Sequence, residues 1–287
     1  MFSTNQKVII ARIISFFVVK IRHFLRLKAI TISKRRGLFW ELNLEEGIDL
    51  SIYILGSFEP STLKAYSSII NQGDIVFDIG ANIGSHTLPL AHLVGVSGRV
   101  FSFEPTQFAY KKQLCNLALN PGLNERVVAE QIMLVRSNSS NVPEEVHSSW
   151  PLTKTQNLHA GHLGALKSTS GARAISLDSY VQMSSINRMD FIKLDVDGYE
   201  LDVLSGATQC IAKFRPIILL ELAPYVFEDT YATFDDLIYY FHNLGYDFYS
   251  ISSRTPLGRD MEVIRSWIPE NGSINVLAIF GLAELAK

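Results

Sequence analysis

The chain has 287 residues, 47% of them hydrophobic and 19% charged, which is the composition of a globular protein with one large domain or two small ones. The formal net charge is −2, but residues 1–40 contain nine Lys or Arg and no Asp or Glu, so the rest of the chain has 17 basic against 28 acidic residues. An acidic body argues against a nucleic-acid groove, and therefore against a nucleic-acid partner.

The first predicted element is a basic amphipathic helix within residues 7–28. Its apolar runs are interrupted by charges and are far shorter than the roughly 20 residues that a spanning helix needs. At 100° per residue, Arg12, Ser15 and Arg22 fall on one side and large apolar residues on the other. The apolar side either packs on the body or on a partner chain, or lies in a membrane interface. We expect residues 1–36 to be an extension of a cytoplasmic protein, with peripheral membrane contact as one outcome.

Residues 37–72 predict a hairpin followed by a helix. Two segments, 38–42 and 50–54, alternate like short strands, and a loop with Gly47 joins them. The segment 59–70 is typical of a helix with a proline at its start.

From residue 73 to 287 short apolar strands alternate with helices. This order predicts an α/β fold, with a mostly parallel twisted sheet of the Rossmann-like kind and helices on both faces. Residues 136–171 break the alternation and are expected to form a long loop or flap. The elements predicted in chain order are strands at 75–79, 99–104, 126–135, 173–177, 191–196, 217–222, 246–251 and 274–280, and helices at 85–94, 107–120, 178 onward, 200–212 and 234–244.

The turn VFDIGANIGSHTL (76–88) follows the first of these strands. Gly80 and Gly84 allow the backbone to bend and approach a ligand, or serve only a structural turn. Asn82 stands where a dinucleotide site needs glycine, and no Lys–Ser/Thr pair follows, so neither a dinucleotide fingerprint nor a P-loop is present. Asp78 would repel a phosphate and suits a ligand with an ammonium group beside a carboxylate.

An acidic residue also ends the next strand. Glu104 lies where a carboxylate can accept hydrogen bonds from both hydroxyls of a ribose. One edge of the site therefore suits an amino acid and the neighbouring edge suits an unphosphorylated ribose. S-adenosylmethionine contains both groups.

The segment FIKLDVDGYELDVLSGA (191–207) carries the candidate catalytic residues. Asp195 and Asp197 lie at the carboxyl end of a strand, on the same side as Lys193. Paired carboxylates there orient a substrate, take a proton or hold a metal, or they cap the following helix. Glu221 is a third acid at the same rim.

The ordered motifs resemble the FkbM family of S-adenosylmethionine-dependent methyltransferases over roughly residues 38–280. The resemblance implies a class I methyltransferase fold with a C-terminal antiparallel hairpin, and methyl transfer to a hydroxyl of a sugar or secondary metabolite. The family commonly has Glu where this chain has Asp197. By position, Asp195 lines the methyl-transfer site, Glu104 binds the ribose, and the turn that holds the methionine part comprises Asp78, Gly80, Ala81, Asn82 and Gly84.

A hydroxyl acceptor needs a base, and the candidates in falling order are Asp195, Asp197, His86 and Lys193. We expect a small-molecule or glycan substrate and no resident metal. Two other functions remain open, a nicotinamide-dependent sugar reductase or epimerase and a non-catalytic membrane-associated scaffold. The missing third glycine and the absent Tyr-x-x-x-Lys argue against the reductase.

Overall fold

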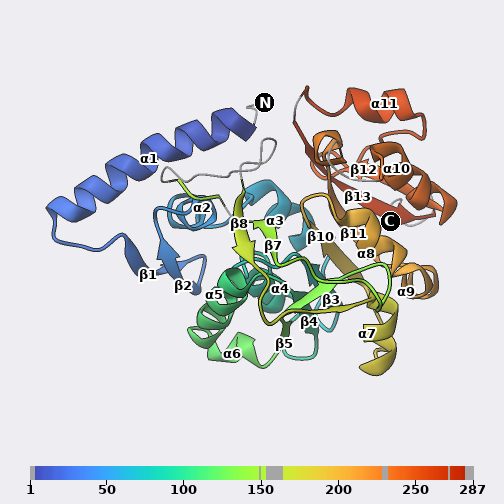
Figure 1. Cartoon of the computed structure of the whole chain (residues 1–287), viewed down its shortest axis with the longest axis horizontal. Coiled ribbons are helices and arrows are strands. Elements are labelled where there is room, and N and C mark those ends of the chain that lie inside the picture. The colour runs from blue at the N-terminus through green and yellow to red at the C-terminus, as the bar shows by residue number, and fades with distance from the viewer. Residues whose placement is uncertain (1–3, 149, 153–163, 228–231, 271, 282–287) are drawn as a thin grey trace.

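The computed structural model describes residues 4–148, 150–152, 164–227, 232–270 and 272–281 (Figure 1). Within them the central sheet has seven strands: β3 (Ile75–Ile79), β4 (Arg99–Phe103), β5 (Val127–Glu130), β10 (Phe191–Leu194), β11 (Ile217–Leu222), β12 (Tyr246–Ser250) and β13 (Ile274–Phe280).

The strand order is β12-β13-β11-β10-β3-β4-β5. Among these seven described strands, β13 runs in the direction opposite to the other six. The predicted α/β class and the C-terminal antiparallel pair are therefore confirmed. After β3 the chain adds β4 and β5 on one side of β3 in the sheet, and it later adds β10 on the other side. The strand order therefore reverses between β3 and β10. Ligands of open α/β sheets bind at the carboxyl ends of strands at such a point.

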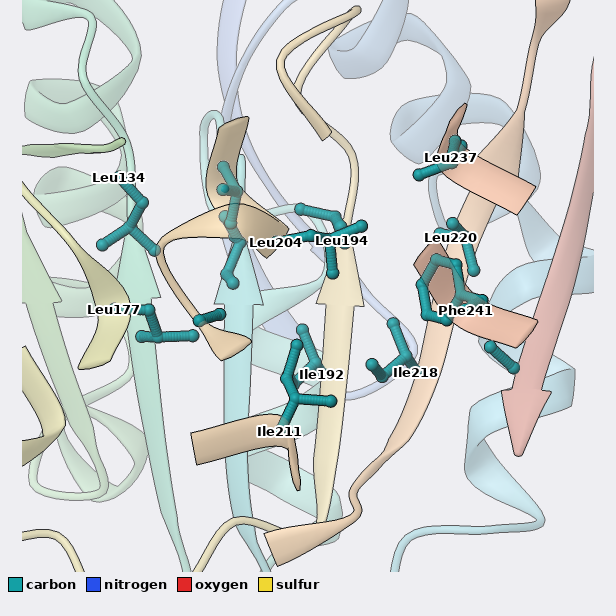
Figure 2. Packing of buried hydrophobic residues seen from close by; sticks show 14 of the residues in the cluster. Leu134, Leu177, Ile192, Leu194, Leu204, Ile211, Ile218, Leu220, Leu237 and Phe241 are labelled. Carbon is teal, nitrogen blue, oxygen red and sulfur yellow. The ribbon is translucent and has the colours of Figure 1, made fainter. Parts of the chain in front are cut away.

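The strands are nearly continuous apolar runs because both faces of the sheet are covered. One face packs on helices from the second half of the chain. Figure 2 shows Ile192 of β10 beside Ile218 of β11, with Ile211 and Phe241 from the helices packed against them. The helices on this face are α7 (Leu177–Met183), α8 (Glu200–Ser205), α9 (Thr208–Phe214) and α10 (Phe234–Asn243). The single helix predicted over 200–212 is thus two helices.

The opposite face packs on helices from the first half of the chain. Val76, Val100 and Leu219 belong to this second core. Because strand residues alternate between faces, the polar residues Asp78 and Lys193 lie on this face too. The helices here are α2 (Gly47–Leu55), α3 (Pro60–Ser67), α4 (Thr87–Leu93), α5 (Gln107–Ala118) and α6 (Pro121–Asn124).

The N-terminal hairpin differs from the prediction. Strands β1 (Ile30–Arg35) and β2 (Leu38–Asn43) pair through a tight turn at Arg36 and Gly37, both with positive φ. Since β2 already has this partner, the segment predicted as the second strand forms helix α2 instead. The hairpin therefore crosses the predicted boundary at residue 36 rather than lying within residues 37–72.

Helix α1 (Thr4–Phe24) packs on the body with the side opposite to the one that was expected to bury. Val8 and Ser15 are buried, and the Ser15 hydroxyl donates to the Leu44 carbonyl at 2.8 Å. Of the alternatives, packing of the apolar side on the body does not occur in the described structure; Arg12 and Arg22 are partly buried on the body side, and the large apolar residues point outward. Contact of that side with a partner chain or a membrane interface stays a prediction. No helix in the described part of the chain is long and apolar enough to cross a bilayer.

The segment 136–171 contains strands in its described portions. Strands β7 (Glu145–Ser148) and β8 (Ala165–Ser168) pair antiparallel, so this part of the predicted flap is ordered structure. Residues 149 and 153–163 of the flap lie outside the described residues. The remaining elements are β6 (Ile132–Leu134), which pairs with β9 (Arg173–Ile175), the 3-10 helix η1 (Pro224–Phe227) and α11 (Met261–Ser266).

Candidate active site

A cavity of about 1050 Å³ opens at the carboxyl ends of β3, β4, β10 and β11. This volume is at the upper end of the roughly 300–1,000 Å³ that small-molecule sites occupy, and suits two ligands side by side. Seven of the residues predicted from the sequence line it: Gly80, Asn82, His86, Glu104, Lys193, Asp195 and Asp197. The structure thus brings together residues that are up to 117 positions apart in the chain.

The turn after β3 is pressed against the turn after β10. Gly80 has a φ of +78°, and a Cβ placed on it would lie 1.8 Å from the Asp195 carbonyl oxygen. No side chain fits there, so glycine is required by close approach as well as by backbone conformation.

Lys193 is a buried cation that ties these two turns together. Its Nζ lies 3.0 Å from Asp195 Oδ2 and 3.8 Å from Asp78 Oδ1, and donates to the Gly80 carbonyl at 3.2 Å. Burial alone would lower the pKa of Lys193, but the carboxylates of Asp195 and Asp78 outweigh burial and hold the pKa above its usual value. Lys193 therefore stays protonated, which makes it a poor candidate for the base.

Asp78 supports the site from below instead of facing the cavity. It is fully buried, and its Oδ2 accepts a hydrogen bond of 2.6 Å from the Thr87 hydroxyl. Gln113 in turn donates to both Thr87 and the Ser102 hydroxyl, at 3.0 and 2.8 Å. Asp78 does not line the cavity, and Lys193 lies against its carboxylate, so the expected direct contact with the cofactor stays a prediction.

Glu104 and Asn82 shape the neighbouring part of the cavity. Glu104 Oε2 accepts from the Asn82 amide at 2.9 Å, and Oε1 accepts from the amide of Thr106 at 2.8 Å. Burial raises the pKa of Glu104, while the hydrogen bonds from Thr106 and Asn82 act against burial. Asn82 has a φ of +49°, and its side-chain amide donates to Ser148 of β7 at 3.2 Å. The flap is thereby joined to the Gly-rich turn.

Asp197 and Glu221 form an acidic cluster with Asp195 on the floor of the cavity. Burial, and then the nearby charge of Asp195, raises the pKa of Glu221 to about 8. Burial also raises the pKa of Asp197 well above its usual range, followed by the effect of Asp195 and Glu221. Glu200 holds this turn by accepting hydrogen bonds from the amides of Val196 and Gly198. An electronegative floor of this kind attracts a cation.

His86 is buried and lines the cavity. Burial, followed by the charge of Lys193, lowers the pKa of His86 to about 3, so the imidazole is neutral. Its Nδ1 lies 3.2 Å from the Tyr66 hydroxyl, and its Nε2 lies 4.0 Å from Glu59 Oε2. A neutral imidazole can orient an acceptor hydroxyl, but a pKa this low makes it a weak base.

Two predicted residues of the turn do not line the cavity. The amides of Ala81 and Gly80 both donate to the Phe103 carbonyl at 3.0 Å, so the Ala81 amide is engaged by β4. Gly84 has a φ of +84° and lies against Leu88 and Gln113. In the described structure Ala81 and Gly84 shape the turn, and their expected contact with the cofactor stays a prediction.

Some lining residues were not among the predicted site residues. Glu59 enters from the start of α3, where it has a φ of +44° and accepts from Asn275 at 3.1 Å. Nothing in its sequence context indicates this position, since the approach of α3 to the sheet is a tertiary event. Phe58 and Trp150, whose rings are 5.5 Å apart, add an aromatic wall. Among the described residues no group of three or more His, Cys, Asp or Glu is arranged to hold a metal ion.

The comparisons with known proteins agree with this site. The Methyltransferase FkbM domain matches residues 78–248, more than half of the chain. The chain belongs to the FkbM methyltransferase family. The matched domain is that of a methyltransferase family, which agrees with the methyltransferase class and the S-adenosylmethionine donor expected from the sequence.

Individual relatives of this FkbM chain are distant. It is 24% identical over 161 residues to the hexuronic acid methyltransferase AglP of Haloferax volcanii, covering 56% of this chain and 61% of AglP. The structure of an FkbM methyltransferase from Methylobacillus flagellatus is 16% identical with a TM-score of 0.45, covering 77% of this chain and 47% of that one. An O-methyltransferase from Thermotoga maritima is 14% identical with a TM-score of 0.42, covering 92% and 82%. The chain thus spans about three fifths of AglP and about half of the first structure.

Proposed function

We propose that this protein transfers a methyl group from S-adenosylmethionine to a hydroxyl of a sugar. The observation that carries the proposal is the convergence of Glu104, Asp195 and the Gly80 turn on one cavity. The similarity to AglP, a hexuronic acid methyltransferase, favours a sugar over other acceptors.

The cavity fits S-adenosylmethionine in shape and in charge. Glu104 would accept hydrogen bonds from the ribose, and the turn at Gly80 and Asn82, which lines the cavity, would hold the methionine part. Met133 of β6 and Val146 of β7 supply an apolar wall for the adenine. The bound cofactor supplies an activated methyl group on a sulfonium, and the carboxylates of the floor favour that positive charge.

The acceptor would occupy the part of the cavity beside Asp195. Lys193 fixes the Asp195 carboxylate, which can accept a hydrogen bond from the acceptor hydroxyl. Asp195 is the first candidate to take the proton of that hydroxyl, and Asp197 in the same turn, whose pKa is raised by burial, is the second. Alignment of the hydroxyl with the methyl group and exclusion of water then account for much of the rate.

Labelled methyl transfer tests the function. We expect the purified protein to move a labelled methyl group from S-adenosylmethionine onto a glycan that contains hexuronic acid. Mild alkali distinguishes the products, since it removes a methyl ester from a carboxyl group and leaves a methyl ether. A product lost in alkali would contradict hydroxyl methylation. Calorimetric binding of NADH instead of S-adenosylmethionine would favour the reductase.

Replacing Glu104→Gln is expected to weaken S-adenosylmethionine binding by about tenfold or more, because an amide accepts ribose hydrogen bonds less strongly than a carboxylate. Isothermal calorimetry measures the change. Glu125→Gln is the matched control, since Glu125 is exposed at the end of α6. Equal affinities of the two variants would show that the ribose binds elsewhere.

Cofactor affinity is expected to increase with pH. Below a pH of about 8 Glu221 is protonated in the free protein, and a bound sulfonium lowers the pKa of this group. Binding therefore releases a proton, and affinity should rise roughly tenfold between pH 6 and 9. S-adenosylhomocysteine, which has no sulfonium charge, should show a smaller increase, and Glu221→Gln should reduce the difference between the two ligands. Calorimetry in buffers of different ionisation enthalpy counts the protons, and identical profiles would contradict this account.

A further inference from the structure

The outward side of α1 carries many exposed large apolar side chains in the described structure. Figure 1 shows α1 lying along the edge of the molecule, over α2. Phe17 and Phe24 are 59% and 86% exposed, although such side chains are normally buried. The exposed large apolar residues of this surface, here called the α1 surface, are Ile9, Ile10, Ile13, Ile14, Phe16, Phe17, Ile21, Phe24, Leu25, Leu27, Ile30 and Ile32.

The charges around the α1 surface have one sign. Residues 1–40 contain no acidic residue, and exposed cations such as Lys20, Arg26 and Lys28 lie among or beside the apolar side chains. Lys34 extends the exposed side of β1 on which Ile30 and Ile32 lie. An apolar face with surrounding cations complements the acyl boundary and the head groups of an anionic lipid layer. A second copy would have to bring the same exposed cations against these ones, which charge repulsion opposes.

The cavity reaches the α1 surface. Ile10 and Ile14 belong to the surface and also line the cavity, as do the exposed Ile54 and Leu55 at the end of α2. The cavity therefore has an apolar end beside α1 and a carboxylate-rich end at Asp195. An amphiphile fits such a cavity with its polar head at the acids and its chain toward the surface.

We propose that the α1 surface docks the protein on an anionic lipid bilayer, and that the methyl acceptor is a sugar carried by a membrane lipid. The second part rests on the proposed function, while the docking does not. Helix α1 lies parallel to the bilayer with Phe17 and Phe24 inserted and the cations at the head groups. The apolar end of the cavity then faces the bilayer, so a lipid-borne sugar enters without leaving the membrane.

Vesicle flotation of the full chain tests the docking. We expect at least about tenfold more protein on vesicles of phosphatidylcholine with phosphatidylglycerol than on phosphatidylcholine alone, and less at high salt. The variant Phe17→Glu/Phe24→Glu should lose most of this binding. The matched control is Val96→Glu/Met183→Glu, at apolar positions that are 87% and 70% exposed outside the α1 surface, and it should bind as the wild type does.

Three measurements distinguish loss of docking from misfolding and from an incorrect acceptor class. Calorimetry with S-adenosylmethionine should give equal affinities for both double variants, which shows that each is folded. An alkyl glucuronide should have a KM at least about tenfold below that of free glucuronic acid, and Leu55→Glu should remove this advantage. Absence of vesicle binding, or a wild-type dimer that Phe17→Glu/Phe24→Glu dissociates, overturns the docking. Methylation of neither sugar contradicts the acceptor class while vesicle binding still decides the docking.

Discussion

Replacing Gly80→Ala is expected to abolish S-adenosylmethionine binding and to lower the free energy of unfolding by about 2–6 kcal/mol. The added Cβ would lie 1.8 Å from the Asp195 carbonyl oxygen, and both partners are backbone, so neither can rotate away. The positive φ of Gly80 adds strain to the steric overlap. Relief requires the β3 and β10 turns to separate, which displaces Lys193 from Asp78 and from the Gly80 carbonyl. Thermal or urea unfolding together with calorimetry measures both effects.

Gly122→Ala is the control for this change. Gly122 lies in α6, and a Cβ there would meet nothing within 4 Å. Alanine favours a helix more than glycine does, so we expect unchanged or slightly higher stability. A Gly80→Ala protein with wild-type stability and affinity would show that the two turns are farther apart than the structure places them.

Replacing Asp195→Asn is expected to lower kcat by roughly 10²–10⁴ while leaving S-adenosylmethionine affinity within a few fold. The amide keeps the shape of the carboxylate, but it cannot take the proton from the hydroxyl that receives the methyl group. It also accepts a weaker hydrogen bond from that hydroxyl. It also removes the strongest ion pair of Lys193, at 3.0 Å, so the position of the acceptor loosens. Single-turnover methyl transfer and calorimetry separate the chemical step from binding.

Asp202→Asn is the matched control, because Asp202 is an exposed residue of α8 whose partner, Arg136, is exposed too. A surface ion pair of this kind contributes little to stability. The opposite result for Asp195→Asn, a weak cofactor complex with normal turnover of the complex that forms, would assign Asp195 to cofactor binding.

The sequence predicted the sheet and the rim of the site well, for a simple physical reason. The short apolar strands at 75–79 and 217–222 occur in the structure at those residues, because strands buried on both faces leave an unbroken apolar run. Glu104 and Asp195 follow such strands directly, and parallel strands end at a common edge. Their meeting in one cavity could therefore be predicted from local pattern alone.

The structure differs from the sequence-based predictions at segments whose position is determined by tertiary contacts. The segment 50–54 alternates like a strand, but the Arg36–Gly37 turn gives β2 another partner. Asp78 and Glu104 are both buried acids at strand ends, yet Asp78 lies against Lys193 of the neighbouring strand β10, and of the two only Glu104 lines the cavity. Helix α1 packs on the body with its more polar side, through the hydrogen bonds of Ser15 to the Leu44 carbonyl and of Arg22 to the Tyr53 hydroxyl, which the periodicity of the helix alone does not show.

The segments 45–47 and 150–152, here called the roof, both contribute residues that line the cavity, and they are joined to each other through main-chain atoms. The Gly47 amide donates to the Trp150 carbonyl and the Leu152 amide to the Glu45 carbonyl, both at 2.8 Å. Substitution of Glu45, Trp150 or Leu152 leaves the donors and acceptors in place, apart from exchange to proline, whereas a Cβ on Gly47 would lie 3.2 Å from the Trp150 carbonyl oxygen. Acceptor preference can consequently diverge among descendants of this sequence through changes in the roof, while the enclosure that keeps water from the reacting methyl group is inherited intact.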